Sequence, residues 1–171
     1  MIKFLTNNFP LINLYKKPST KSEIVTQMIY GDSFSILKKS KKWIKIKIKE
    51  DNYKGYILNK KFSYFLKPTH KVSILKAKIY KSPNKNKGAG ELTFGSKIKV
   101  TGKKTKFLRF DKGWVSKKDV KPLSFRGKNP FKKISIFKNI RYKWGGKSFK
   151  GIDCSALVQL FINFNKKYCP R

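Results

Sequence analysis

The residue with the clearest chemical potential is Cys154, near the middle of the segment from Tyr142 to Gln159. Asp153 directly before it is a good helix cap, and the apolar residues that follow predict a helix over residues 153–165. The Cys154 thiol would then lie in the first helical turn, where the helix dipole favours the nucleophilic thiolate. An ionised Asp153 opposes this effect. The residues alone leave two interpretations open, a reactive nucleophile or an inert, buried cysteine.

The approach to the cysteine is rich in glycine and also carries two aromatic side chains, Tyr142 and Trp144. Its glycines are Gly145, Gly146 and Gly151. This stretch resembles the nucleophile segment of the NlpC/P60 family of papain-like cysteine peptidases. The family pattern is Tyr-x-Trp-Gly-Gly, a short loop, and then Asp-Cys-Ser-Gly-Leu-Val. Ala156 stands where the family usually has glycine, a replacement that a helix tolerates well.

The resemblance implies a hydrolase of the dipeptidyl-peptidase VI type, a γ-D-glutamyl-L-diamino acid endopeptidase that acts on peptidoglycan stem peptides. By this likeness Cys154 attacks the amide, and Tyr142 supports the oxyanion or the substrate. Asp153 and Ser155 bind the free amino end of L-Ala, and Trp144 forms a wall of the pocket. A thiolate attack, proton transfer by a histidine and hydrolysis of the acyl-enzyme complete the reaction, with no metal or other cofactor.

Upstream of this segment the chain is predicted to form short strands. Residues 44–48 alternate isoleucine with lysine, which is the pattern of a half-buried strand. Asp51 and Asn52 supply turn chemistry before a second strand over 53–57, so we expect a hairpin. Residues 72–123 have a similar character, with alternation again over 97–100.

The two β-rich stretches share three ordered matches, which indicate an internal repeat. The matched segments are 13–18 with 78–83, 29–32 with 93–96, and 55–57 with 113–115. They resemble tandem bacterial SH3 (SH3b) domains, small β-barrels often attached to cell-wall enzymes. In relatives of this kind the first SH3b domain also closes the active site through an acidic and a tyrosyl residue, for which Asp32 and Tyr53 are the candidates.

The expected fold is therefore mainly β: two small SH3-like barrels followed by the helical N-terminal part of a papain-like α+β peptidase domain. The expected boundaries are 1–66 and 67–124 for the two SH3b domains and 125–171 for the incomplete peptidase domain. Asn129 and Pro130 are typical of a helix start, and apolar residues at 131, 134, 137 and 140 predict an amphipathic helix there.

A cysteine peptidase of this type also needs a histidine base. The single histidine, His70, lies between the two β-rich stretches, whereas the family places its catalytic histidine well after the cysteine. We therefore expect a C-terminally truncated, inactive sequence. The helix over 153–165 is then expected to expose apolar surface, because the sheet that would cover it is missing.

The net charge of +35 suggests a partner that is an anionic polymer, but only 4 of the 43 basic residues are arginines. Proteins that recognise nucleic-acid bases usually do so with arginine. Lys, Ile, Asn and Phe, which are all abundant here, have AT-rich codons, so an AT-rich genome can account for the many lysines. We therefore expect no specific nucleic-acid partner. A non-catalytic SH3b protein that binds wall peptides is the main alternative, and a basic nucleic-acid binder is a weaker one.

Other features of the sequence bear on disulfide bonds, membrane insertion and cellular location. Two cysteines are too few for a disulfide framework, and no apolar run is long enough for a transmembrane helix. The N-terminus is a poor signal peptide, because Thr, Asn and Pro interrupt its apolar core. We expect a monomer in the cytoplasm that binds peptidoglycan-derived peptides, while export to the cell envelope stays an alternative.

The missing base leads to a direct prediction. The purified 171-residue protein should not hydrolyse L-Ala-γ-D-Glu-diamino acid peptides, as measured by chromatography of the products. Turnover that the Cys154→Ala substitution abolishes would contradict this expectation.

Overall fold

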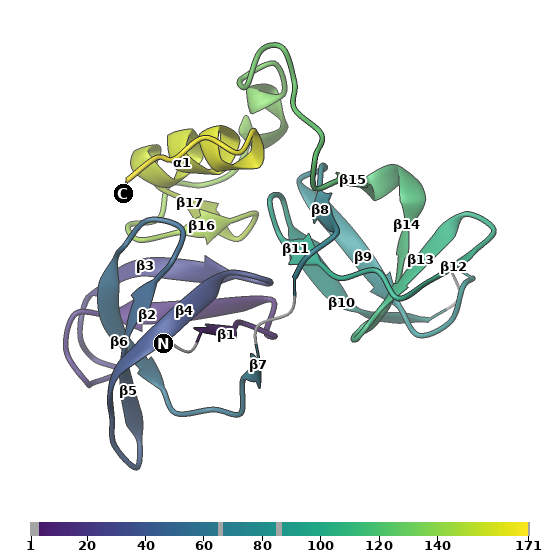
Figure 1. Ribbon diagram of the computed structural model, residues 1–171. Coiled ribbons are helices and arrows are strands. Elements are labelled where there is room, and N and C mark those ends of the chain that lie inside the picture. Colours follow the sequence, from purple (N-terminus) through teal and green to yellow (C-terminus); the bar gives the residue numbers. More distant parts are fainter. Residues whose placement is uncertain (1–3, 65–66, 85–86, 171) are drawn as a thin grey trace.

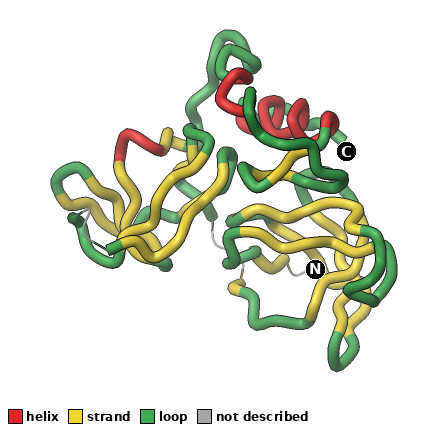
Figure 2. The backbone as a smooth tube through the Cα atoms, turned by 180° about the vertical axis from the view of Figure 1, so that it is seen from behind, coloured by secondary structure: helices red, strands yellow, loops and turns green. Residues whose placement is uncertain are grey.

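A computed structural model describes residues 4–64, 67–84 and 87–170. These residues form two β-units and a C-terminal part that lies against both of them (Figure 1). The view from behind shows the same arrangement, with the single α-helix stacked above a short hairpin and the first β-unit beneath the hairpin (Figure 2). The expected domain boundary falls beside residue 66, which lies outside the described residues.

The first β-unit is one antiparallel sheet with the strand order β3-β2-β6-β5-β4-β1-β7. The predicted hairpin is confirmed: β5 and β6 pair in register, and Asn52 in the turn has a φ of +60°. Alternate residues of β5 are buried in the core of this unit. The strands are β1 (Phe4–Thr6), β2 (Leu11–Tyr15), β3 (Ile24–Ile29), β4 (Ser33–Lys39), β5 (Trp43–Ile48), β6 (Lys54–Leu58) and β7 (Ser63–Tyr64).

The second β-unit contains two antiparallel sheets, with orders β10-β9-β14-β13-β12 and β11-β8-β15. In the described residues of both units the edge strands stay unpaired, so the expected barrels are open sheets rather than closed ones. The elements are β8 (His70–Val72), β9 (Lys76–Tyr80), β10 (Gly88–Thr93), β11 (Lys97–Ile98), β12 (Gly102–Lys104), β13 (Phe107–Phe110), β14 (Gly113–Ser116), a 3₁₀ turn (Lys117–Asp119) and β15 (Val120–Pro122).

The three matched segments occupy equivalent positions in the two units. Gly31 and Gly95 lie in equivalent turns with φ of +86° and +84°, a conformation that glycine adopts without a steric cost. Both turns are closed by the same backbone hydrogen bond, from Asp32 to Ile29 and from Ser96 to Thr93. The strand pairs are equivalent as well, joining Tyr15 to Tyr56 and Tyr80 to Trp114.

The C-terminal part differs from expectation at its start. The α-helix predicted from Asn129 is wrong, since residues 130–133 form turns and only Ile134–Phe137 forms a 3₁₀ helix. The apolar residues recur at every third position, which is the period of a 3₁₀ helix and not the 3.6 of an α-helix. Successive backbone bonds accordingly span three residues, as from Ile136 to Lys133 and from Ile140 to Phe137.

The helix predicted over residues 153–165 is confirmed as α1 (Cys154–Phe164), which follows the hairpin of β16 (Lys147–Ser148) and β17 (Gly151–Ile152). Most of its apolar surface is covered, contrary to expectation. Ile29 of the first unit and Phe94 of the second belong to the same core cluster as α1. The Phe94 ring lies 4.8 Å from that of Phe161 and 4.7 Å from that of Phe164, centroid to centroid. Both β-units therefore contribute to the core that covers α1.

The second unit also caps the far end of α1. Lys71 is 3% exposed, and its ammonium donates to the carbonyl oxygens of Leu123, Phe125 and Phe164. Burial, with the nearby charges of Lys166 and Arg126, lowers the pKa of Lys71 to about 8. A cation at a helix C-terminus interacts favourably with the helix dipole, so this lysine fixes α1 to the second unit.

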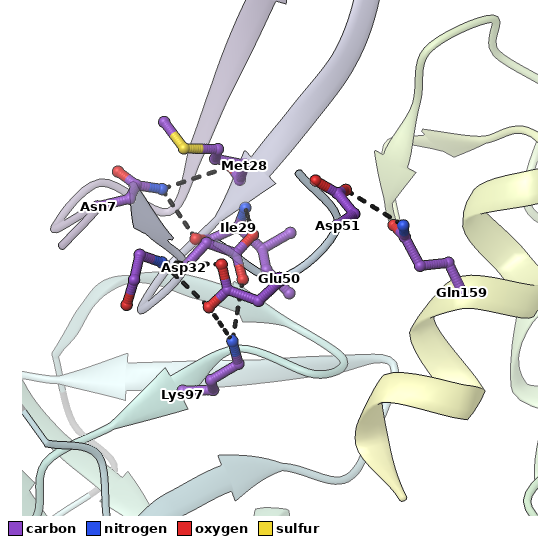
Figure 3. Close-up of polar contacts among 9 residues, drawn as sticks. Asn7, Met28, Ile29, Asp32, Glu50, Asp51, Lys97 and Gln159 are labelled. Atoms are coloured by element: carbon purple, nitrogen blue, oxygen red, sulfur yellow. Dashed lines mark hydrogen bonds and ion pairs between the residues drawn. The ribbon is translucent and has the colours of Figure 1, made fainter. Parts of the chain in front are cut away.

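A buried ion cluster joins the two β-units. The Lys97 ammonium of the second unit lies 2.6 Å from a Glu50 carboxylate oxygen and 3.3 Å from one of Asp32, both in the first unit (Figure 3). Burial by itself lowers the pKa of Lys97, but the two carboxylates outweigh it and raise the pKa. Burial raises the pKa of Glu50, against the attraction of Lys97. Each charge is thus held in place by its partners.

Removal of the cation should therefore be costly. Lys97→Met leaves two carboxylates without a counter-ion, and breaking a buried pair in this way costs about 3–5 kcal/mol. The control is Lys76→Met, because Lys76 pairs with Glu91 on the surface and such pairs contribute about 0–1 kcal/mol. Urea unfolding of both variants gives the comparison, and equal losses of stability would be inconsistent with the buried cluster.

Candidate active site

Cys154 is exposed at the first residue of α1 and is therefore not a buried cysteine. Asp153 is the N-cap, as predicted. Its Oδ1 accepts hydrogen bonds from the Ala156 amide at 2.7 Å and from the Ser155 hydroxyl at 2.9 Å. Asp153 therefore fixes the first turn of the helix that presents the thiol and holds the Ser155 side chain beside it.

The glycine-rich loop lies alongside the residues that lead into the helix. Tyr142 forms a parallel β-bridge with Ile152, and the Asp153 amide donates to the Gly146 carbonyl over 3.3 Å. The side chains of Tyr142 and Trp144 are both 64% exposed. The loop that carries Tyr142 and Trp144 thus lies against the residues that lead into α1, where Asp153 and Ser155 flank Cys154, and its two aromatic rings are exposed.

The first β-unit holds this loop in place at the start of β3. The indole Nε1 of Trp144 donates to the Glu23 carboxylate over 2.9 Å. Hydrogen bonds from Lys16 and from Trp144 lower the pKa of Glu23. Gly145 has a φ of +68°, and a Cβ there would lie 2.3 Å from the Ile24 carbonyl oxygen. Only glycine allows so close an approach of the two backbones.

A buried glutamine makes the next contact along β3. Gln27 is 1% exposed, accepts the Lys147 amide at 2.8 Å and donates to Asn13 over 2.8 Å. It thereby docks β16 on the first unit. Sequence reasoning missed both Glu23 and Gln27. For Gln27 the signal was a long polar side chain in the middle of a strand that is mostly apolar, whereas nothing in the sequence marks Glu23.

The hairpin turn between β5 and β6 connects the first unit to α1. The Gln159 side chain, which is fully buried, donates to Asp51 over 3.1 Å (Figure 3). The other carboxylate oxygen of Asp51 accepts the Tyr53 amide at 3.0 Å. Tyr53 therefore lies in a turn that α1 itself restrains. Neither Asp51 nor Gln159 was predicted as a site residue.

Asp32 lies in a different environment. It is 2% exposed, and its carboxylate accepts the Ile29 amide at 2.9 Å and pairs with Lys97. The structure thus places Asp32 in the junction of the two β-units, and it does not bring Asp32 together with Tyr53 or Cys154 through any contact among the described residues.

His70 lies in β8 of the second unit, paired with Ile98 and Pro122. Its Nδ1 is 2.9 Å from the Thr69 hydroxyl, and burial, with a smaller effect of Lys103, lowers its pKa. No hydrogen bond joins it to Cys154 in the ranges that the structure describes. Within these ranges there is also no cluster of three or more metal-ligating side chains and no helix long and apolar enough to cross a membrane.

Comparison with known proteins supports the likeness seen in the sequence. Residues 14–62 match the family described as the bacterial dipeptidyl-peptidase Sh3 domain. The whole fold is similar to the crystal structure of an NlpC/P60 family protein from Bacillus cereus, with a TM-score of 0.82 and 16% identity over 98% of this chain and 74% of that one. No curated protein matches the sequence.

Two more distant structures, NlpC2 and NlpC1 from Trichomonas vaginalis, are 16% and 14% identical. The superposition with NlpC2 covers 100% of this chain and 69% of NlpC2, and that with NlpC1 covers 99% of this chain and 65% of NlpC1. Both have a TM-score of 0.35. The chain thus contains a bacterial Sh3 segment within a fold like that of an NlpC/P60 family protein.

The close approach at Gly145 gives a test of how the loop is held. Gly145→Ala should cost about 2 kcal/mol or more, since the left-handed conformation alone costs an L-residue roughly 1–2 kcal/mol and the new Cβ meets a backbone oxygen. It should also change the fluorescence of Trp144. The matched control is Gly88→Ala, where a Cβ meets nothing within 4 Å. A Gly145→Ala protein as stable as the control would show that the loop is not anchored there.

Proposed function

We propose that the chain carries the nucleophile half of a cysteine peptidase that cleaves the γ-D-glutamyl–diamino acid amide of peptidoglycan stem peptides. The observation that supports this most is the exposed Cys154 thiol at a capped helix N-terminus. Exposed aromatic rings on the adjoining loop, which the first β-unit restrains, supply the walls of a substrate pocket. The match of residues 14–62 to an Sh3 domain of bacterial dipeptidyl-peptidases supports the substrate class.

The proposed chemistry is acyl transfer. The Cys154 sulfur forms a bond to the γ-carbonyl carbon of D-glutamate, and the amide C–N bond then breaks to release the diamino acid with a proton on its nitrogen. Water hydrolyses the thioester. The first backbone N–H groups of a helix lack intrahelical acceptors, so those of Cys154 and Ser155 can hold the oxyanion, with the Tyr142 hydroxyl as a further donor.

Recognition of the substrate follows from the same first turn. A carboxylate can accept about four hydrogen bonds, so Asp153 can bind the free ammonium of L-Ala in addition to its bonds within the turn. Ser155 contributes its hydroxyl oxygen, and the Trp144 ring packs on the peptide. Tyr53 closes the site from the first β-unit, since its turn contacts α1, and we do not assign this role to Asp32.

The proposal requires an imidazole base near Cys154. His70 is the one histidine of the 171-residue sequence, and it belongs to a sheet of the second β-unit. We therefore propose that the base comes from a histidine outside these residues. Added imidazole is a diffusible substitute for it in experiments.

The position of His70 also favours a second candidate, a protein that binds wall peptides without cleaving them. The two candidates differ in one property. Only the peptidase requires a Cys154 thiol that reacts when a peptide is bound.

A substrate-like electrophile can test the proposal. L-Ala-γ-D-Glu chloromethyl ketone should alkylate Cys154, with loss of chloride, and mass spectrometry should find the adduct there and not on Cys169, the other free cysteine. Free L-Ala-γ-D-Glu should protect the thiol. An N-acetylated label should react at least about tenfold more slowly, because a hydrogen bond to a charged group contributes roughly 1.5–3 kcal/mol.

The control is Asp153→Asn, which retains an N-cap and removes the charge that would bind the ammonium. It should remove the preference for the free amine and leave the helix intact by circular dichroism. Labelling of Cys154 and Cys169 at equal rates, without protection by the dipeptide, would count against the peptidase.

A further inference from the structure

A cavity of about 610 Å³ lies where the three parts of the chain meet. The first unit contributes Pro10 and Leu11, the second unit contributes β9 and β10, and the C-terminal part contributes the turn between β16 and β17, including Phe149 and Lys150. The Phe149 amide donates to the Thr93 hydroxyl over 3.2 Å, which fixes this turn over the second unit. None of the residues proposed for catalysis lines this cavity.

Glycines create the hollow. Gly88 faces Tyr80 across the β9–β10 pair, and the strand register shifts between Gly88 and Gly90. A Cβ at Gly88 would meet nothing within 4 Å, and one at Gly90 would meet only the end of Ile79 at 3.7 Å. Because these positions lack side chains, the backbone of β10 stays accessible to a ligand, while Tyr80 beside it is buried.

The charged residues on the cavity walls are two lysines, Lys78 and Lys150, and one acid, Glu91. Glu91 is already paired with Lys76 at 2.9 Å, a cation whose other neighbour is the Phe149 ring. Lys78 and Lys150 line the cavity, and neither has a carboxylate within ion-pair distance in the part of the chain that the structure describes. Glu91 lies opposite Lys78 across the strand pair but bonds to Lys76, so the Lys78 and Lys150 ammonium groups remain available to a ligand in the described part of the chain.

A second hollow of about 340 Å³ is a neighbour of this cavity, since Leu11 and Lys150 line both. This hollow adds Lys143, Lys60 and the Tyr15 ring. Together the two form a groove that is lined with lysines along its length and that has apolar surface between them. We call it the lysine groove.

We propose that the lysine groove binds an extended peptide that carries carboxylates and small apolar side chains. Neither hollow is lined by arginine, the residue whose planar fork matches phosphate, which disfavours a phosphate polymer. The groove instead places aromatic and aliphatic surface between separate lysine ammonium groups. This arrangement suits a peptide in which methyl and carboxylate groups alternate. Stem peptides of the wall have this composition, and their choice as the source rests on the proposed function.

Titration of the ¹⁵N-labelled protein with L-Ala-γ-D-Glu-meso-diaminopimelate-D-Ala tests the proposal. The amide signals of Gly88, Gly90 and Phe149 should shift. Gly88→Leu should abolish these shifts without loss of stability, because the new side chain enters open space in the groove. The Lys78→Ala/Lys150→Ala variant should bind about tenfold or more weakly.

The matched control is Lys38→Ala/Lys39→Ala, which removes the same charge from the exposed end of β4. If the control binds the peptide as weakly as the groove variant, or if polyphosphate causes the same shifts, the binding is non-specific charge attraction and the proposal is overturned. Gly88 and Gly90 signals that do not shift with the peptide would overturn it as well. The amides of Trp144 and Ser155 report the candidate active site separately. If the lysine groove does not bind the peptide, the alkylation of Cys154 is still expected. If Cys154 is not a peptidase nucleophile, the Gly88 signal is still expected to shift.

Discussion

The packing of α1 against both β-units is the constraint on which the other features depend. The buried face of α1 is covered by the hairpin before it, by residues 131–140 and by apolar residues of both units, of which Ile29 and Phe94 are the most buried. Ile29 and Phe94 come from the two equivalent glycine turns. Burial of a phenylalanine ring contributes about 1.5–3 kcal/mol, and Phe94 contacts three other rings of the cluster. The two equivalent turns therefore both contact the helix, although through neighbouring and not identical positions of the repeat.

Apolar contacts alone would allow α1 and the two β-units to shift relative to one another, and polar contacts fix their relative positions. Glu50 and Asp51 are neighbours in one turn, yet Glu50 bonds to Lys97 of the second unit and Asp51 to Gln159 of α1. Lys71 caps the other end of the helix. Since such contacts are directional, they select one arrangement of the three parts and hence one position for the thiol.

Local sequence was enough to predict the features that depend on near neighbours. The capped helix at Cys154, the hairpin of β5 and β6, and the equivalence of the two glycine turns all follow from short-range pattern. The 3₁₀ helix at Ile134 was missed, because an apolar residue at every third position was taken as the period of an α-helix. The partners of Trp144, Asp32 and Gln159 could not be predicted, since they lie in other units and depend on how the parts pack.

The division of the core of α1 between two units has a consequence for biosynthesis. Domains fold largely in the order in which they leave the ribosome, and both β-units precede the helix in the sequence. Ile29 and Phe94 are in place only when both units have folded, so α1 cannot find its core earlier. The helical turn that carries Cys154 is thus organised only after both β-units have folded, and a nascent chain with a misfolded first or second unit leaves α1 without its core.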